Sequence, residues 1–520
     1  MYDSAFLLAQ NAEPKWIARG LTTIDWCIIG AYAVGTLWLG WYYGRQQKST
    51  REYFVGTGSM HPGLIGVSLF ATLLSTISYL SMPGESLGKG PAYMLTPLGL
   101  PIAYLVVGYG LLPVYMKHRV TSAYELLELK LGLSIRMLGA IMFVLLRLIW
   151  MSLLIYKTSE ALTVMLGVGP NMIPLIALIT GAIAVTYTSI GGLRAVVITD
   201  LMQTILLYGG ALTVLGVITW RLGGFGWFPT HWDPNWDTQP VFSLNPAVRV
   251  TIIGGILNYT TWLIATSGGD QTSVQRFMAT TDVKAARRAL GIQMIVSFVV
   301  AITLGLVGFA LLGYFASNPD QLPKTMNLKE DADKVFPYFI SYLLAPGISG
   351  LVVAAMFAAA MSSIDSGVNS ITAVVMTDFM DRFDRSPKTE VGHVRTARWM
   401  AFGIGAFVVL CSSLVGQVPG NITTVTNKTA NLLSTPIFGL FFFAIFVRFA
   451  SPTGVWIGTI CSTLVAILIA FSGPVSVMMG STSTADPISF QWIAPVTLAT
   501  NIVTGILGSL MFPNRQLSPK

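Results

Sequence analysis

The sequence contains thirteen stretches that are long and apolar enough to cross a lipid bilayer. A bilayer core of about 30 Å requires about 20 apolar residues per helix. A window of that length finds spans near residues 23–44, 63–84, 91–116, 137–165, 171–189, 194–219, 249–271, 286–316, 335–379, 396–416, 422–447, 453–472 and 489–512. The ninth stretch is too long for one crossing, and Pro346 and Gly347 are expected to divide it into a short external helix and a span near 348–379. The chain is therefore expected to be an all-α integral membrane protein.

The low content of charged residues supports this class. Only 10% of the 520 residues are charged, against roughly a quarter in soluble domains, and 53% are hydrophobic. This composition excludes soluble, disordered, collagen-like and disulfide-rich proteins. The three cysteines, Cys27, Cys411 and Cys461, are odd in number and far apart, so they indicate neither a disulfide framework nor a zinc site. No secretory signal precedes the first span, which is therefore expected to remain in the protein.

The distribution of Lys and Arg predicts the orientation in the cell membrane. With the N-terminus outside, twenty of the 31 cations fall in cytoplasmic loops, among them Lys48, Arg136, Arg276, Arg515 and Lys520. Eight fall in external loops: Lys15, Arg19, Lys89, Arg221, Arg249, Lys324, Lys329 and Lys334. This bias favours a cytoplasmic C-terminus. It also assigns the net charge of +8 to anionic lipid headgroups rather than to nucleic acid, and no obligatory protein partner is evident.

Two spans carry dense polar residues at mid-membrane depth. They read ATLLSTISYLS from Ala71 and NYTTWLIATSGGDQ from Asn258. They stand five spans apart, and an odd spacing inverts the orientation of corresponding helices. Two inverted five-span repeats (63–219 and 249–447), each beginning with an interrupted helix, are typical of secondary transporters. Span 23–44 would then precede the repeats, and spans within 453–512 would lie at the periphery. Alternatively, the hydroxyls bond back to their own helices.

The ninth span places oxygen-bearing side chains on one helical face. Ala359, Ser362, Ser363 and Ser366 recur at helical spacing, and Asp365 lies at the edge of that face. Such oxygens suit a hard cation. Close helix packing would explain the serines but not the carboxylate, because an ionisable group inside a span indicates function by default.

Further charged residues lie within or near the spans. Asp200 stands six residues after Arg194, about 9 Å into the membrane, and either binds a cation or pairs with a neighbouring basic group. Arg147 either holds a substrate carboxylate or neutralises a buried aspartate. Lys157 and Glu160, three residues apart, are expected to pair with each other. The sequence contains no Walker loop, zinc-helix motif or serine elbow, so no enzymatic activity is expected.

Four segments together resemble the solute:sodium symporter family, which includes sodium/glucose cotransporters and sodium/sialic acid symporters. They are GSMHPGLIGVSLFATLLSTISYLSMPG, TYTSIGGLRAVVITDLMQT, DQTSVQRFMATTDVKAARRA and MFAAAMSSIDSGVNSITA. The resemblance covers about residues 21–513. It implies a LeuT-type core of two inverted five-helix repeats, with one additional span before it and two after it. It also implies sodium-driven uptake by alternating access.

The resemblance also implies sodium ligands. One sodium ion would bind the main-chain carbonyls of Ala71, Leu74 and Ala359 and the hydroxyls of Ser362 and Ser363. These carbonyls are free only if the second span is unwound there, although neither Gly nor Pro lies at the break.

A second sodium, seen in some sialic acid transporters, would map to Asp200, Ser362, Asp365 and Ser366. This chain has Asp365 where those relatives have serine, and the added charge either strengthens that site or links it to protons.

The family pattern places solute contacts on three spans: Ser75, Ser78, Tyr79, Thr96 and Trp262. Sialic acid transporters have a carboxylate-binding arginine where this sequence has Trp150. Arg147, one turn away, would be its substitute, and the mismatch argues against sialic acid. Trp150 itself suits stacking on a sugar or another ring.

The sequence thus predicts a sodium-coupled importer of a small polar solute, either sugar-like or an organic acid. The alternatives are a proton-coupled transporter of the same fold and a membrane sensor that binds solute without transporting it.

Overall fold

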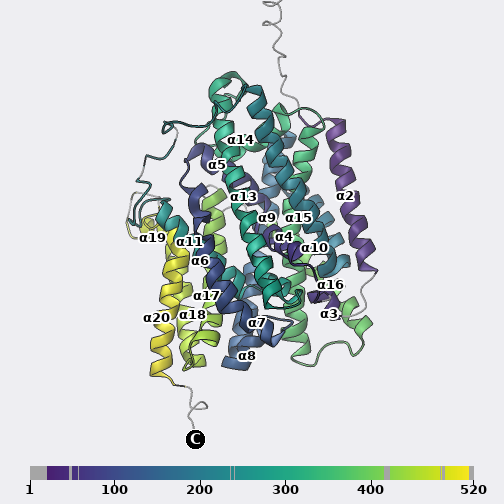
Figure 1. The fold of residues 1–520 in the computed structure, drawn as a ribbon, viewed down its shortest axis with the longest axis vertical. Coiled ribbons are helices and arrows are strands. Elements are labelled where there is room, and N and C mark those ends of the chain that lie inside the picture. Colours follow the sequence, from purple (N-terminus) through teal and green to yellow (C-terminus); the bar gives the residue numbers. More distant parts are fainter. Residues whose placement is uncertain are drawn as a thin grey trace, which may run out of the picture.

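The computed structural model of the protein describes residues 20–513, apart from residues 46–49, 57, 235, 239, 415–421, 481 and 483–485. Some of the sequence predictions concern residues that are not described. They are five of the cations used for orientation (Lys15, Arg19, Lys48, Arg515 and Lys520), residues 1–19 of the N-terminal segment, and residues 415 and 416 of the tenth predicted span. The described residues form helices and no β-strand (Figure 1). The all-α class is therefore confirmed.

The long helices run side by side through an elongated bundle (Figure 1). In the first half of the chain they are α2 (Thr23–Gly44), α9 (Leu133–Leu166), α10 (Ile173–Arg221) and a bent run of η1 (Tyr93–Gly99), α6 (Leu100–Leu105), η2 (Val106–Leu111) and α7 (Leu112–His118). In the second half they are α13 (Val283–Ser317), α15 (Ile348–Val374) with its extension η6 (Val375–Asp381), α16 (Glu390–Ser412), α17 (Ile422–Phe446), α18 (Pro452–Ala470) and α20 (Ile493–Met511).

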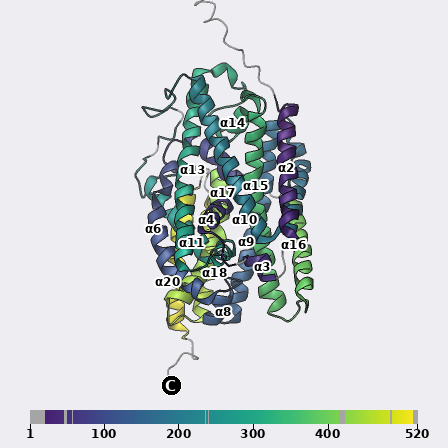
Figure 2. The same ribbon diagram turned by 45° about the vertical axis from the view of Figure 1, so that its right-hand side comes forward.

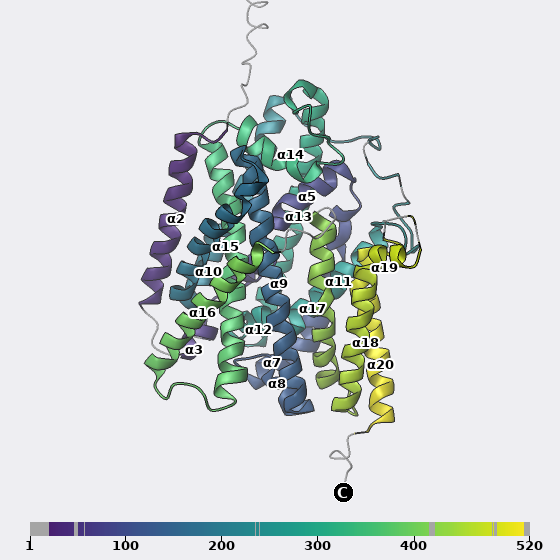
Figure 3. The same cartoon turned by 180° about the vertical axis from the view of Figure 1, so that it is seen from behind.

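Shorter helices mark the two ends of the bundle. One end, called here the α14 end, holds α14 (Ala332–Tyr338), and the opposite α8 end holds α8 (Glu125–Leu131) and α3 (Thr50–Val55) (Figures 1 and 2). Seen from behind, α2 lies along one side, and α18 and α20 lie along the other, with α19 (Ser472–Met478) above them (Figure 3).

Fewer helices meet a membrane-span criterion than the thirteen spans expected. Among the described residues, ten helices are long and apolar enough to cross a membrane, or eleven if one bent pair counts as a single span. The fifth and sixth predicted spans are two helices within α10 that meet at a kink at Gly192 (φ 61°, ψ −177°), a backbone conformation that essentially only glycine adopts. The seventh is not among these helices, because its polar residues lower the mean hydropathy of its 18-residue helix. A count of thirteen is therefore not confirmed.

Two of the helices in the middle of the bundle are interrupted. Helix α4 (Pro62–Leu73) and α5 (Thr76–Gly88) meet at an angle of 68°. Leu74 and Ser75 between them are extended, and the Ser75 hydroxyl accepts a hydrogen bond from the Ser78 amide at 3.5 Å. Similarly, α11 (Ile252–Gly269) and α12 (Gln271–Met278) are separated by extended Asp270. Both breaks fall within the two polar segments singled out in the sequence.

Helix α15 lies inside the bundle and is buried over most of its length. It packs against α10, α2, α9 and α4. Small residues allow this close approach: Ala354, Ala355, Ala358, Ala359 and Ala360. Its first turn is held by α2, because Asp25 Oδ1 accepts hydrogen bonds from the amides of Gly347 (2.8 Å) and Gly350 (2.7 Å). The helix that carries the polar face is thus fixed at its α14 end.

Candidate functional site

The break between α4 and α5 faces the polar side of α15. Ser362 Oγ donates hydrogen bonds to the carbonyl oxygens of Ala71 (2.8 Å) and Ala359 (3.2 Å). Ser363 Oγ is buried and has no hydrogen-bond partner among the described residues. Leu74 is extended at the break, and it lines a cavity that is described below. Of the five residues expected around the first sodium, the structure therefore brings Ala71, Ala359 and Ser362 into contact, with Leu74 and Ser363 near them in the chain.

Two of the residues expected around a second sodium, Asp200 and Ser366, contact Arg276 of α12, one turn along α15 from Ser362. The guanidinium is fully buried and donates to the hydroxyls of Ser68 (2.7 Å) and Ser366 (2.5 Å) and to Asp200 Oδ2 (3.3 Å). Ser68 Oγ also donates to Asp200 Oδ2 at 2.5 Å, and Asp200 Oδ1 is buried without a partner in the described structure. Sequence reasoning missed this role, since Arg276 was counted among the loop cations.

Asp365 completes this cluster from the other side. Its Oδ2 accepts a hydrogen bond from the Tyr187 hydroxyl, and its Oδ1 accepts one from the Ser366 amide at 3.1 Å. The cluster thus holds two carboxylates and one guanidinium in a volume closed to solvent. Ser366 Oγ lies 3.0 Å from Thr72 Oγ1, which links the cluster to the last turn of α4.

A cavity of about 90 Å³ opens beside the break. It is lined by Phe70, Leu73, Leu74, Ser78, Met82, Tyr93, Trp150, Asn258, Tyr259, Trp262, Ser297, Ala301, Thr426, Asn427 and Ala430. Three of the predicted solute contacts are in this lining: Ser78, Trp150 and Trp262. Leu74 thus belongs both to the break and to the lining of the cavity.

The other predicted solute contacts lie elsewhere. The Ser75 hydroxyl caps α5, and Tyr79 packs on Phe336 of α14 with ring centroids 5.5 Å apart. Thr96 faces a narrow space of about 10 Å³ next to Gly255. Arg147 forms an ion pair with Asp270, the residue at the break between α11 and α12. Of the two roles open to Arg147, the structure shows the neutralisation of a buried aspartate.

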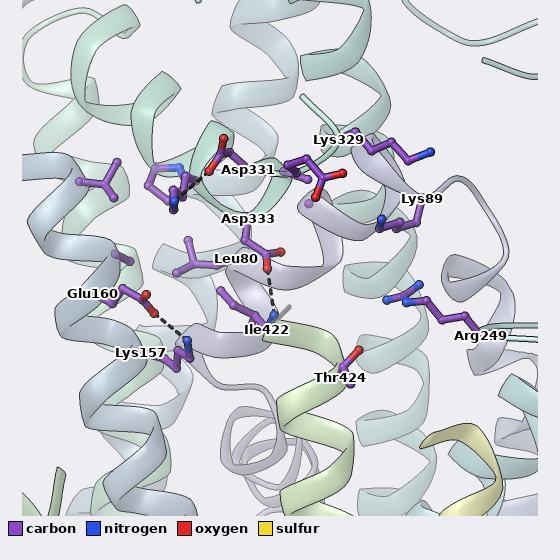
Figure 4. Close-up of a pocket in the computed structure, with 17 residues that line it drawn as sticks. Leu80, Lys89, Lys157, Glu160, Arg249, Lys329, Asp331, Asp333, Ile422 and Thr424 are labelled. Atoms are coloured by element: carbon purple, nitrogen blue, oxygen red, sulfur yellow. Dashed lines mark hydrogen bonds and ion pairs between the residues drawn. The ribbon is translucent and has the colours of Figure 1, made fainter. Parts of the chain in front are cut away.

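A larger cavity of about 470 Å³ lies at the α14 end (Figure 4). The two cavities share α5 and α17, with Leu80 and Thr424 in the larger lining and Ser78 and Thr426 in the smaller. The wall of the larger cavity carries both signs of charge. Lys157 Nζ lies 2.7 Å from Glu160 Oε2, which confirms the pair expected from the sequence.

Asp333 stands between the α14-end cavity and the start of α17. Its Oδ2 accepts a hydrogen bond from the Ile422 amide at 2.9 Å (Figure 4). Burial raises the pKa of this carboxyl to about 6, although the same hydrogen bond acts in the opposite direction. Asp333 is therefore a contact between α14 and α17 whose charge changes near neutral pH.

At the opposite end, ion pairs tie α8, α9 and the extension of α15 together. Arg136 contacts Asp378 at 2.7 Å and Glu128 at 2.6 Å, and Arg382 contacts Glu128 at 2.8 Å. Hydrogen bonds from Arg382, and then from Arg136, hold the pKa of Glu128 below its ordinary value. The Ser122 hydroxyl donates to Asp378 at 2.5 Å. These contacts close the α8 end around α15.

The sequence model of the Sodium:solute symporter family matches residues 53–512. The chain belongs to this family. It is therefore a multi-pass membrane protein that couples a small organic solute to sodium, and it falls among transporters rather than enzymes. Sodium is a co-transported substrate in this family, and the oxygen-rich break between α4 and α5, which faces α15, offers the kind of ligand that this ion prefers.

Curated relatives and a solved structure support the same assignment. The sodium/sialic acid symporter SiaT of Proteus mirabilis is 29% identical over 513 residues, covering 95% of this chain and 97% of the relative. The human sodium-coupled monocarboxylate transporter 2 is 26% identical, covering 87% and 71%.

A solved substrate-bound, outward-open structure of a Na⁺-coupled sialic acid symporter, with a novel Na⁺ site, has a TM-score of 0.80 to this symporter. It is 26% identical, covering 95% of this chain and 100% of that one. This agreement confirms the LeuT-type fold class.

Proposed function

We propose that this symporter imports a small polar organic solute together with Na⁺ by alternating access, with the first sodium at the α4 break. The observation that carries the proposal is the orphaned Ser363 hydroxyl. A buried hydroxyl without a partner costs about 1–3 kcal/mol. A cation coordinated by the hydroxyl oxygen would offset this cost. Ser362, next to Ser363 on α15, donates to the carbonyls of Ala71 and Ala359, and extended Leu74 ends helix α4 at the break.

A second sodium is proposed at Asp200, Asp365 and Ser366, together with Ser362. Its support is the charge balance of the cluster, in which two carboxylates face one guanidinium, that of Arg276. A proton on Asp365 would satisfy the same balance, and this is the proton-coupled alternative.

The sodium gradient supplies enough free energy for accumulation. One positive charge crossing 100 mV releases about 2.3 kcal/mol, and a tenfold sodium gradient adds about 1.4 kcal/mol. About 3.7 kcal/mol per ion would concentrate a neutral solute roughly 500-fold. Coupling requires only that sodium completes the solute site in one conformation, since the coupling free energy is reciprocal. Leu74, shared by the break and the cavity, is the proposed link.

We also propose the orientation and the internal repeat. The Lys and Arg bias puts the α8 end in the cytoplasm, the N-terminus outside and the C-terminus inside, so that solute enters through the α14-end cavity. Two five-span units, 63–219 and 249–447, account for the two interrupted helix pairs α4–α5 and α11–α12. The span 23–44 and the spans within 453–512 would then be additions to this core.

Uptake by purified protein in liposomes tests the proposal. A thermal-shift screen of sugars, sugar acids and monocarboxylates, with and without Na⁺, first identifies solutes whose binding depends on sodium. Liposomes are then given an inward Na⁺ gradient, the same gradient of choline, or a pH gradient without sodium. Accumulation above the external concentration with Na⁺ alone is expected.

Each other outcome selects an alternative. Accumulation driven by pH without sodium would establish proton coupling. Sodium-dependent binding without accumulation in any gradient would make the protein a sensor and refute transport.

A further inference from the structure

The lining of the 90 Å³ cavity is entirely uncharged. It combines amides, hydroxyls and aromatic rings with aliphatic side chains, and none of its fifteen residues is Asp, Glu, Lys or Arg. Tyr259 and Trp262 present tilted rings 5.7 Å apart, and Trp150 lies in the same wall. A cavity of this composition offers stacking surfaces and neutral hydrogen-bonding groups.

The basic residues nearest in sequence to the lining are already paired. Arg147, three residues from Trp150, forms its ion pair with Asp270. Lys428, next to Asn427, contacts Asp486 at 2.6 Å. Neither side chain is among the lining residues. A carboxylate that entered the cavity would lose its hydration without meeting a positive charge, which is far costlier than burying a neutral polar group.

Neutral hydrogen-bonding groups are available inside the cavity. Thr426 Oγ1 is buried in the lining and has no partner among the described residues. Asn258 Nδ2 donates to Asn427 Oδ1 at 3.0 Å, and Asn427 Nδ2 donates to the Tyr93 hydroxyl at 3.2 Å. This amide and phenol chain is fixed by the protein itself, so it presents its remaining lone pairs and protons in set directions.

We propose that the transported solute is an uncharged, compact molecule with one ring face and several hydroxyl or amide groups. This inference rests on the proposed function, because it identifies the solute of the same cavity. The ring would lie against Trp150 or Trp262, and its polar edge would meet Thr426 and the Asn258–Asn427 pair. About 90 Å³ holds only a few water molecules, which requires a compact solute. The relatives described above, by contrast, are named for sialic acid and monocarboxylates.

Uptake of two sets of probes tests the class of solute. D-galactose and myo-inositol represent the neutral class, and N-acetylneuraminate and L-lactate represent the carboxylates. In sodium-driven liposomes the wild-type protein should accumulate at least one neutral probe tenfold or more over choline controls, and neither carboxylate more than twofold. The Trp150→Arg variant adds a cation to the cavity wall and should raise carboxylate uptake at least tenfold relative to wild type. Trp220→Arg places the same charge on an exposed position at the end of α10 and should change neither set.

The outcomes separate this inference from the proposed function. Wild-type accumulation of a carboxylate, or no accumulation of either neutral probe by a protein that Na⁺ still stabilises thermally, would overturn the neutral class and leave sodium coupling standing. A protein that neither accumulates any probe nor responds thermally to Na⁺ would refute the proposed function. If Trp150→Arg fails to fold, the selectivity of the wild-type protein alone decides.

Discussion

The buried pair of Arg276 and Asp200 allows a prediction of size and sign. Both side chains are fully buried, and Arg276 donates four hydrogen bonds, to Thr272, Ser68, Ser366 and Asp200. Removing one partner of a buried ion pair leaves an uncompensated charge and costs about 3–5 kcal/mol. We therefore expect Arg276→Gln and Asp200→Asn each to lower the free energy of unfolding by about 4 kcal/mol.

The double variant should lose much less than the sum of the two. With both charges removed, neither is left unpaired, and the coupling energy of such contacting residues reaches about 3 kcal/mol. The loss for Arg276→Gln with Asp200→Asn should therefore be about 5 kcal/mol instead of about 8 kcal/mol. Equilibrium unfolding of the purified protein in mixed detergent micelles measures all four free energies.

A matched control pair lies on the surface. Lys334 Nζ is 2.8 Å from Asp331 Oδ1, but the lysine is half exposed. Exposed pairs contribute about 1 kcal/mol or less, so Lys334→Gln and Asp331→Asn should show a coupling energy below that value. If the Arg276 and Asp200 variants instead add within about 0.5 kcal/mol, the interpretation of the cluster as a compensated charge pair is refuted.

Two further predictions concern residues that hold α14 and α15. The pKa of Asp333 is about 6 in the folded protein and about 4 in an unfolded chain. The contribution of this carboxyl to stability is therefore complete below pH 4, and it is lost as the pH rises through 6. Between pH 5 and pH 7, the wild-type protein should therefore lose about 1 kcal/mol more stability than the Asp333→Asn variant. Thermal unfolding measures this difference, and parallel pH profiles of the two proteins would contradict it. Asp25→Ala removes the acceptor of the Gly347 and Gly350 amides and should cost about 1–2 kcal/mol; an unchanged unfolding free energy would show that α2 does not anchor α15.

The sequence predicted the elements of the site better than their contacts. The polar segments starting at Ala71 and Asn258 were visible because hydroxyls and amides are costly in hydrocarbon, and both contain a helix break in the structure. The oxygen face of α15 followed from helical periodicity alone. The position of the break at Leu74 and Ser75 could not be predicted, because neither Gly nor Pro marks these two extended residues in the sequence.

Partners far apart in the chain were beyond local reasoning. Arg276 follows a polar segment and reads as a loop cation, yet its carboxylate partner lies 76 residues earlier. The partner of Arg147 lies 123 residues later, so the sequence left two roles open. Asn427 and Tyr93 were missed because single polar residues near helix ends are common, and only packing shows that they meet at the cavity.

Binding of ²²Na⁺ to the purified protein tests the central claim most directly, because it requires no knowledge of the solute. Wild-type protein should bind ²²Na⁺ that unlabelled Na⁺ displaces and choline does not. Ser363→Ala removes one oxygen ligand worth about 1.5–3 kcal/mol, and it should weaken sodium binding about tenfold to a hundredfold. Ser341→Ala removes another buried hydroxyl, which lies outside the site and has no partner in the described part of the chain, and it should leave the affinity unchanged. Wild-type protein that binds no sodium, or a Ser363→Ala variant with wild-type affinity, would contradict the assignment of the ion to the α4 break.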